Sequence, residues 1–175
     1  MKKLSYLLLI TAMLVSSCSQ DESIPEEEVL TEEQEILNYI NENRTVGYTK
    51  VEWINHSKQE EFVSTKTLNL PELSWDNYLY EAARIQSEHM FETGLCEHIW
   101  LDGTDLNARI KMVNCNYFQS TENICSGYHN YKDAINGWMN SEGHRNNILD
   151  KQYNIVAVSY KDKYWTMVLA YKPPQ

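Results

Sequence analysis

The chain has 175 residues, of which 42% are apolar and 11% aromatic, so it can form one folded domain with short extensions and is not wholly disordered. Its 15 Lys and Arg residues against 25 Asp and Glu residues give a formal charge of −10, which excludes a nucleic-acid binder because no cation excess exists to neutralise phosphates. The longest apolar run, Leu4–Val15, is shorter than the roughly 20 residues that cross a bilayer, which excludes an integral membrane protein.

The N-terminus has the pattern of a secretory signal. Two lysines precede the apolar run Leu4–Val15, and the small residues Ser16 and Ser17 come directly before Cys18. Residues 1–17 are therefore predicted to be a signal peptide. The end of this pattern resembles a bacterial lipobox, which predicts that Cys18 is lipidated and anchors the exported protein to the cell envelope, at the outer membrane or the cell surface. An ordinary cleaved signal peptide with a nearby cysteine is the alternative.

The segment that follows is strongly acidic. Eight Asp and Glu residues and no basic residue fall within residues 21–35. Like charges repel one another and keep a chain extended, so residues 18–30 are predicted to be a solvated tether without a partner of its own. The folded domain is predicted to occupy residues 31–175.

The first half of this domain is predicted to contain two helices. Thr31 begins a capping-box pattern that opens a helix to about Arg44. Val46–Asn69 contains strand-forming residues without a clear period, which leaves a long loop or a hairpin open. A second helix is expected from about Asp76 to Gly94.

The second half is predicted to alternate short helices with strands. A short helix follows Thr104, and Tyr117–Cys125 is expected to be extended. Asn130 precedes apolar residues at helical spacing, which predicts a helix with Trp138 in the core, and Ser141 is expected to cap another helix ending at Leu149. The two β-rich runs 153–160 and 164–171 predict a terminal hairpin.

Three cysteines remain after Cys18, namely Cys96, Cys115 and Cys125. Their spacing contains no C-x-x-C pair, so a cysteine metal site is not expected. They are predicted to be buried thiols, or one disulfide of unspecified pairing, rather than a nucleophile next to His98. The sequence also lacks a phosphate-binding glycine loop, a serine nucleophile elbow and a His-Glu-x-x-His helix.

Two motifs carry a family resemblance. Glu122-Asn123-Ile124, followed by Trp138-x-x-Ser141-x-Gly143-His144-Arg145, resembles the compact bacterial form of the CAP (SCP/PR-1-like) superfamily, over about residues 33–171. The resemblance implies an α+β fold, a three-layer α-β-α sandwich with an antiparallel sheet. It also implies a cleft lined by His98, Glu122 and His144.

The resemblance leaves the chemistry of this cleft open. Some family members bind a divalent metal such as zinc through a histidine pair, which here would be His98 and His144. Glu122 is a candidate catalytic residue if the protein is an enzyme, and Glu142 is a second one because it lies two residues before His144. No nucleophile accompanies these residues.

Three functions are therefore compared. The favoured one is a non-enzymatic lipoprotein, exposed at the surface or in the periplasm, whose cleft binds a lipid, a peptide or a surface ligand. The first alternative is a metal-dependent hydrolase, such as a peptidase, that uses His98, His144 and a glutamate. The second alternative is a structural cell-envelope module in which the His/Glu cluster only stabilises the fold.

Overall fold

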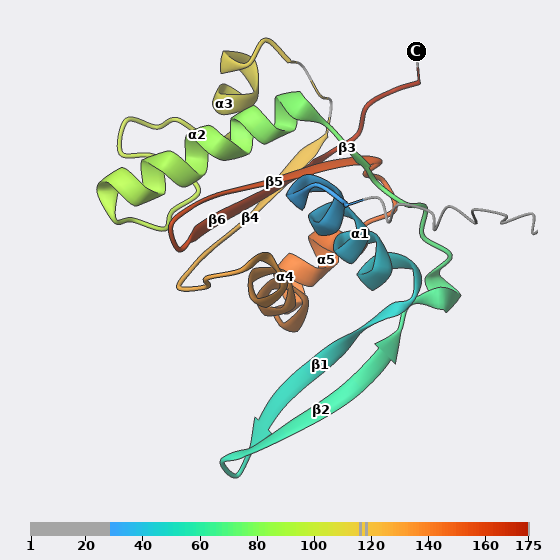
Figure 1. Ribbon diagram of the computed structural model, residues 1–175. Helices are drawn as coiled ribbons and strands as arrows, with labels where there is room; N and C mark the ends of the chain where they lie inside the picture. The colour runs from blue at the N-terminus through green and yellow to red at the C-terminus, as the bar shows by residue number, and fades with distance from the viewer. Residues whose placement is uncertain (1–28, 116, 118, 175) are drawn as a thin grey trace, which may run out of the picture.

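A computed structural model describes residues 29–115, 117 and 119–174, which form a sheet covered by helices on both faces (Figure 1). The four-stranded sheet has the order β3-β5-β6-β4, and its strands are β3 (Ser74–Trp75), β4 (Ser120–Ser126), β5 (Ile155–Lys161) and β6 (Tyr164–Ala170). β6 pairs antiparallel with both β5 and β4. The expected α+β fold with an antiparallel sheet is confirmed, with one addition: the two-residue strand β3 runs parallel to β5.

Each face of the sheet has its own helical layer and its own core cluster. The helices α1 (Glu32–Thr45), α4 (Tyr131–Asn140) and α5 (Glu142–Leu149) cover one face, and α2 (Asn77–Thr93) and α3 (Leu106–Met112) cover the other. On the first face the core contains Ile36, Ile40, Ile135, Trp138, Met139, Ile148, Trp165 and Met167. On the second it contains Leu79, Ala82, Ala83, Ile110, Ala157, Val168 and Ala170.

The central strands are buried on both sides, which explains their nearly continuous apolar sequence. Along β5, Val156 and Val158 point toward the α1–α4–α5 layer, whereas Ala157 between them points toward α2. The small side chains of Ala157 and Ala170 let α2 pack closely on the sheet. Trp138 is only 1% exposed, so the predicted core position is confirmed.

Most helix boundaries follow the predicted capping residues. Thr31 forms a capping box with Gln34 at the start of α1. The Asp76 carboxylate accepts hydrogen bonds from the first N–H groups of α2, and Gly94 ends that helix in the left-handed conformation (φ 73°). Ser141 does precede α5, but its side chain makes no capping bond, so the predicted side-chain cap is wrong.

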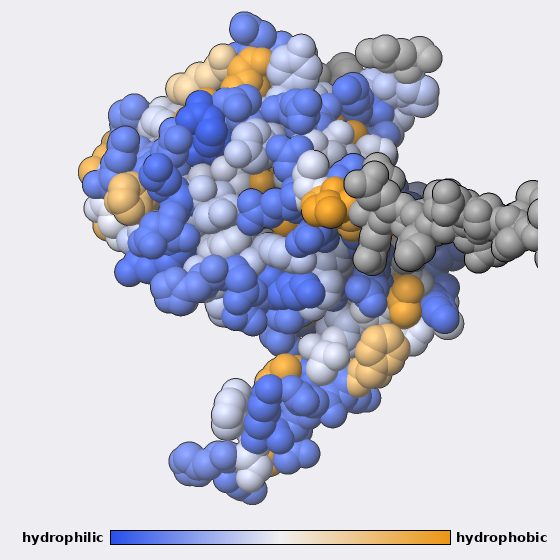
Figure 2. All heavy atoms as spheres, viewed as in Figure 1, coloured by the Kyte–Doolittle hydropathy of each residue, from blue (hydrophilic) through white to orange (hydrophobic). Residues whose placement is uncertain are grey.

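Residues 46–69 include the hairpin of β1 (Gly47–Ile54) and β2 (Ser57–Ser64), which extends away from the rest of the domain (Figure 1). Its two turn residues, Asn55 and His56, both have positive φ, as a tight two-residue turn requires. Figure 2 shows this arm as a mostly hydrophilic surface. About midway along β1, the Val51 N–H donates to Asn140 Oδ1 of α4 at 2.7 Å. The hairpin alternative is therefore the one observed, followed by a 3-10 turn at Lys66–Leu68.

Arg44, at the end of α1, holds the segment that follows α5 in place. Its buried guanidinium donates to the backbone oxygens of Ile148 and Asp150 on one side and Pro71 on the other. Burial lowers the pKa of Arg44 to about 10, which still leaves it charged at neutral pH. This contact fixes the C-terminal end of α5, the helix that carries His144.

Candidate functional site

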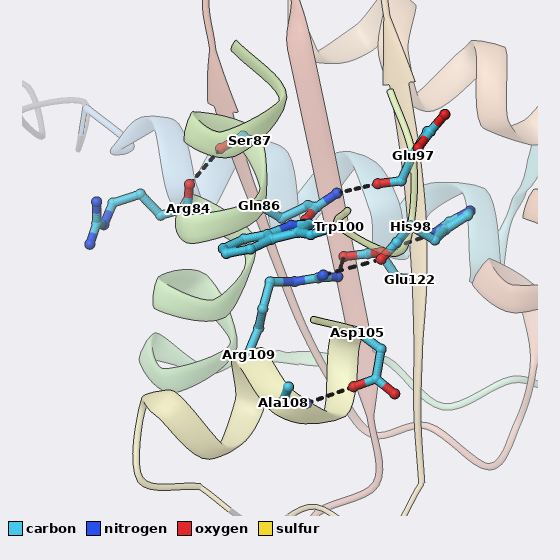
Figure 3. A network of polar contacts seen from close by, with 10 residues as sticks. All are labelled: Arg84, Gln86, Ser87, Glu97, His98, Trp100, Asp105, Ala108, Arg109 and Glu122. Atoms are coloured by element: carbon cyan, nitrogen blue, oxygen red, sulfur yellow. Dashed lines mark hydrogen bonds and ion pairs between the residues drawn. The ribbon is translucent and has the colours of Figure 1, made fainter. Parts of the chain in front are cut away.

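Three hydrogen-bonded side chains, those of His98, Glu122 and Arg109, lie at the outer edge of the sheet (Figure 3). His98 Nδ1 is 2.9 Å from Glu122 Oε1, and Arg109 Nη2 donates to Glu122 Oε2 at 2.6 Å. His98 comes from the loop after α2, Arg109 from α3, and Glu122 from β4. Both oxygens of the Glu122 carboxylate therefore have a partner, and one side of the His98 ring is fixed.

The loop that carries His98 is held through its backbone. Arg109 Nη1 donates to the His98 carbonyl at 3.1 Å, and Gln86 Nε2 of α2 donates to the Glu97 carbonyl at 2.7 Å. The Gln86 side-chain oxygen in turn accepts from Trp100 Nε1 at 2.7 Å. These contacts fix the position of a loop whose side chains lie mostly at the surface.

The supporting roles of Gln86 and Trp100 were not predicted from the sequence. The available signal was a polar residue within the apolar stripe of α2, where Gln86 falls between Ala83 and Met90 and is fully buried. A buried amide needs hydrogen-bond partners, so its position indicated a structural contact, although not which one.

The contact with Glu122 determines what His98 presents to solvent. In the neutral ring, Nδ1–H donates to the carboxylate, so Nε2 has a free lone pair. The His98 side chain is 54% exposed, whereas that of Glu122 is 3% exposed. A groove of about 370 Å³ lies beside them, between β4 and the start of α3. The arrangement offers a fixed, half-exposed imidazole whose Nε2 can accept a hydrogen bond or ligate a metal.

His144, in α5, lies near the same strand β4 but belongs to the helical layer on the other face of the sheet. Asn123 Nδ2 of β4 donates to the His144 carbonyl at 3.0 Å, and Asn123 Oδ1 accepts from Asn147 Nδ2 at 2.8 Å. Because neighbouring strand residues point to opposite faces, Glu122 holds His98 on the α2 side and Asn123 holds α5 on the other. The two histidines therefore belong to different layers, on either side of strand β4.

The pKa of His144 is lowered below 6.5, mainly by burial and also by the positive charge of protonated His98. The ring is thus neutral at neutral pH, which is the form that ligates metals. The position of His144 near a helix N-terminus predicts the same protonation state. The physical causes in the structure are burial and the neighbouring histidine.

The remaining candidate residues are placed less favourably for catalysis. Glu142 lies in the first turn of α5 and is exposed, and within the described residues no hydrogen bond or ion pair joins it to His98, Glu122 or His144. Cys18 lies outside the described residues.

The three other cysteines are free thiols, so the disulfide alternative is not observed. Cys115 and Cys125 are half-buried and Cys96 is exposed, so the expected buried thiol is wrong for Cys96. Partial burial raises the pKa of Cys96, and burial with the neighbouring Cys96 raises the pKa of Cys125 to about 12. Since the thiolate is the nucleophile, these environments do not favour a reactive cysteine at neutral pH.

The donor atoms fit a metal only in part. Two imidazoles can ligate zinc, and a carboxylate behind one of them is a common way to orient it. Among the residues that the structure describes, no group of three or more His, Cys, Asp or Glu side chains is arranged to hold a metal ion. A metal bound here would depend on His98 and His144, with water or a ligand completing its coordination.

Two curated bacterial proteins resemble this chain over about half of its length. It is 34% identical to the uncharacterized membrane protein YlbC of Bacillus subtilis over 97 residues, which are 55% of this chain and 28% of that protein. It is 30% identical to the uncharacterized protein YkwD of the same bacterium over 99 residues, 55% of this chain and 38% of that protein. The matched regions thus span well under half of the length of these relatives.

Solved structures show the same fold. An extracellular protein containing a SCP domain from Bacillus anthracis superposes with a TM-score of 0.65 at 26% identity, covering 81% of this chain and 40% of the other. An outer surface protein of Borrelia burgdorferi gives a TM-score of 0.56 at 21% identity, covering 62% of this chain and 84% of that one.

The model of the CAP family, described as the cysteine-rich secretory protein family, matches residues 37–169, which include α2, β4, α4, α5 and the terminal hairpin. This range contains His98, Glu122 and His144, and it covers most of the chain. The protein belongs to the CAP family.

Proposed function

We propose that this protein is an exported CAP-family binding domain that holds its ligand in the groove beside His98 and Glu122. The observation that carries the proposal is the His98 side chain, whose Nδ1 is fixed by a buried carboxylate and which is half-exposed where it lines the groove. A fixed hydrogen-bonding group at a concave surface is typical of ligand sites. The raised pKa values of Cys96 and Cys125 argue against a nucleophilic role for either of these two thiols.

We further propose that a lipid on Cys18 anchors this domain at the cell envelope. The sequence before Cys18 supports this, and so do two structural neighbours whose names describe an extracellular and an outer surface protein. Among the described residues, no helix is both long enough and apolar enough to cross a membrane. Cys18→Ser is expected to abolish partitioning of the expressed protein into the detergent phase of a Triton X-114 extraction. Unchanged partitioning and unchanged mass would contradict the anchor.

The binding function is tested with three probes, one for each expected ligand class. They are a hexapeptide of alternating lysine and valine, phosphatidylglycerol vesicles, and a soluble N-acetylglucosamine tetramer. We expect at least one to bind, and His98→Gln to weaken that binding by about tenfold or more, which corresponds to about 1.4 kcal/mol.

The matched control is His129→Gln, because His129 is an exposed histidine outside the groove. It is expected to bind like the unmodified protein. If none of the probes binds, or if both variants bind equally well, the groove is not the binding site. Retention of the melting temperature in both variants ensures that binding, not folding, is measured.

A metal-dependent hydrolase is the second candidate, favoured by the two histidines on either side of β4, which are near enough for protonated His98 to help lower the pKa of His144. The chain would hold zinc through His98 and His144. Both carboxylate oxygens of Glu122 already have partners, so Glu122 would not ligate the metal itself but would orient the His98 ring. A bound zinc ion supplies an activated water molecule and polarises a carbonyl group.

The metal site is tested by titrating the protein with zinc. His98→Ala and His144→Ala should each reduce zinc affinity at least about tenfold, and His129→Ala should not. Zinc binding together with zinc-dependent peptide hydrolysis would favour the hydrolase, whereas zinc binding alone would leave the binding function in place. Equal affinity in all variants would exclude this histidine pair as the site.

A further inference from the structure

β4 is the last strand of the sheet, and one edge of it has no neighbouring strand among the described residues. Just beyond its two ends, the Gly127 N–H donates to the Lys163 carbonyl at 3.0 Å, and the Tyr171 N–H donates to the Gln119 carbonyl at 2.9 Å. Both bonds belong to the pairing of β4 with β6, so the odd-numbered residues of β4 direct their backbone groups toward β6. In an antiparallel pair, the residues between these direct their backbone N–H and C=O groups away from the partner strand. The N–H and C=O groups of Ser120, Glu122, Ile124 and Ser126 therefore face outward.

Only part of this edge is accessible. Ser120 at the start of the strand is half-buried, and Glu122 and Ile124 are each 7% exposed, but of these three residues only Ser120 and Glu122 line a groove. The groove of about 370 Å³ lies next to this first part, and its lining includes Ser120 and Glu122 on one side and Ile99, Asp105 and Leu106 on the other. The accessible edge therefore begins at Ser120 and leads to the His98–Glu122 pair.

We propose that this groove binds an extended polypeptide segment, which adds to the sheet as a further strand beside Ser120 and Glu122. The proposal rests on the proposed binding function and names the class of its ligand. Alternate residues of a strand are about 6.8 Å apart, so the outward groups of Ser120 and Glu122 match those of residues i and i+2 of an extended peptide. Such main-chain pairing gives affinity without requiring one particular sequence.

The other wall of the groove indicates which side chains suit it. Ile99 and Leu106 are apolar, and Asp105 carries a negative charge that is used locally to cap α3 through the Ala108 N–H. Glu122 is already paired with Arg109, so Asp105 is the acidic lining residue without an ion pair in the described chain. A peptide with alternating basic and apolar residues therefore fits better than an acidic one. A lipid chain lacks the donors and acceptors that the edge of β4 needs.

The test uses the hexapeptide of alternating lysine and valine in two methylated forms. One form carries N-methyl groups on its three valines and the other on its three lysines. An extended peptide presents alternate N–H groups to opposite edges, so only one form loses the donors that face β4. Because Asp105 selects the face that presents lysine, we expect one form to bind the unmodified protein at least about tenfold more weakly than the parent peptide. The other form should stay within about threefold of the parent peptide.

Protein variants provide the second arm of this experiment. Ser120→Pro removes an outward N–H beside the groove and leaves the bonds to β6 intact, since proline is tolerated at such edge positions. It should weaken binding of the parent peptide at least about fivefold. Ser126→Pro is the matched control, because it makes the same change at the far end of the same edge, outside the groove. It should bind normally.

Three results would overturn the proposal: no binding of the parent peptide, equal binding of the two methylated forms, or normal peptide binding by a folded Ser120→Pro variant. The methylated peptides are measured on the unmodified protein, so this arm does not depend on how the variants fold. If the vesicles or the glycan bind in a His98-dependent way and the peptide does not, the binding function survives and the peptide proposal fails.

Discussion

Trp138→Ala is expected to lower the free energy of unfolding by about 3–5 kcal/mol, as measured by urea denaturation of the purified domain. The Trp138 side chain is 1% exposed and packs among Ile135, Met139 and Trp165 between α4 and the sheet. Alanine would leave a cavity that the surrounding rigid elements can fill only in part. The cost is thus the lost burial of apolar surface plus the cavity itself.

Trp53→Ala is the control for this measurement, since it removes the same side chain from the outer part of the hairpin, where Trp53 is 70% exposed. It should change stability by no more than about 0.5 kcal/mol. Similar losses in both variants, or a loss below about 1 kcal/mol for Trp138→Ala, would mean that α4 does not pack as described.

Arg109→Met should cost about 3–5 kcal/mol of stability, because it leaves the buried Glu122 carboxylate without its cation. Arg109 is fully buried and also donates to the His98 carbonyl, so the variant loses a contact that holds the site loop as well. Adding Glu122→Gln in the same chain removes the uncompensated charge. The double variant is therefore expected to be more stable than Arg109→Met alone.

Arg84→Met is the matched control for the arginine. Arg84 forms ion pairs with Glu81 and Glu88 on the surface of α2, and its side chain is 38% exposed. Surface pairs contribute little, so its loss should stay within about 1 kcal/mol. An Arg109→Met variant as stable as Arg84→Met would show that the Arg109–Glu122 pair does not support the site.

The helices could be predicted from the sequence because their boundaries depend on local residues. Thr31, Asp76 and Asn130 each cap a helix with their own side chains, and Gly94 ends α2 in a conformation that glycine adopts easily. These signals need no knowledge of distant parts of the chain. Ser141 shows the limit of such reasoning, because the residue type and the helix start are as expected but the capping bond is absent.

The contacts within the site depend on residues far apart in the chain, and composition or spacing could not predict them. The meeting of His98 with Glu122, 24 residues away, was expected from the family motif, whereas the Gln86–Trp100 bond was not expected at all. The pattern of residues 47–64 does not distinguish a hairpin from a loop, because its strands face solvent on most of their surface and so lack an alternating apolar pattern.

The hairpin and the rest of the domain differ in the free energy that local unfolding requires. Its base is held by the buried Tyr48 and its middle by the bond from Val51 to Asn140, but the end beyond Val51 has mainly cross-strand contacts. A two-stranded ribbon of this kind opens at a small fraction of the global free energy. Trypsin should therefore cut first at Lys58, near the tip, and leave the helices and the central sheet folded. The same tip is the natural place to insert an epitope that reports whether the domain faces the outside of an intact cell.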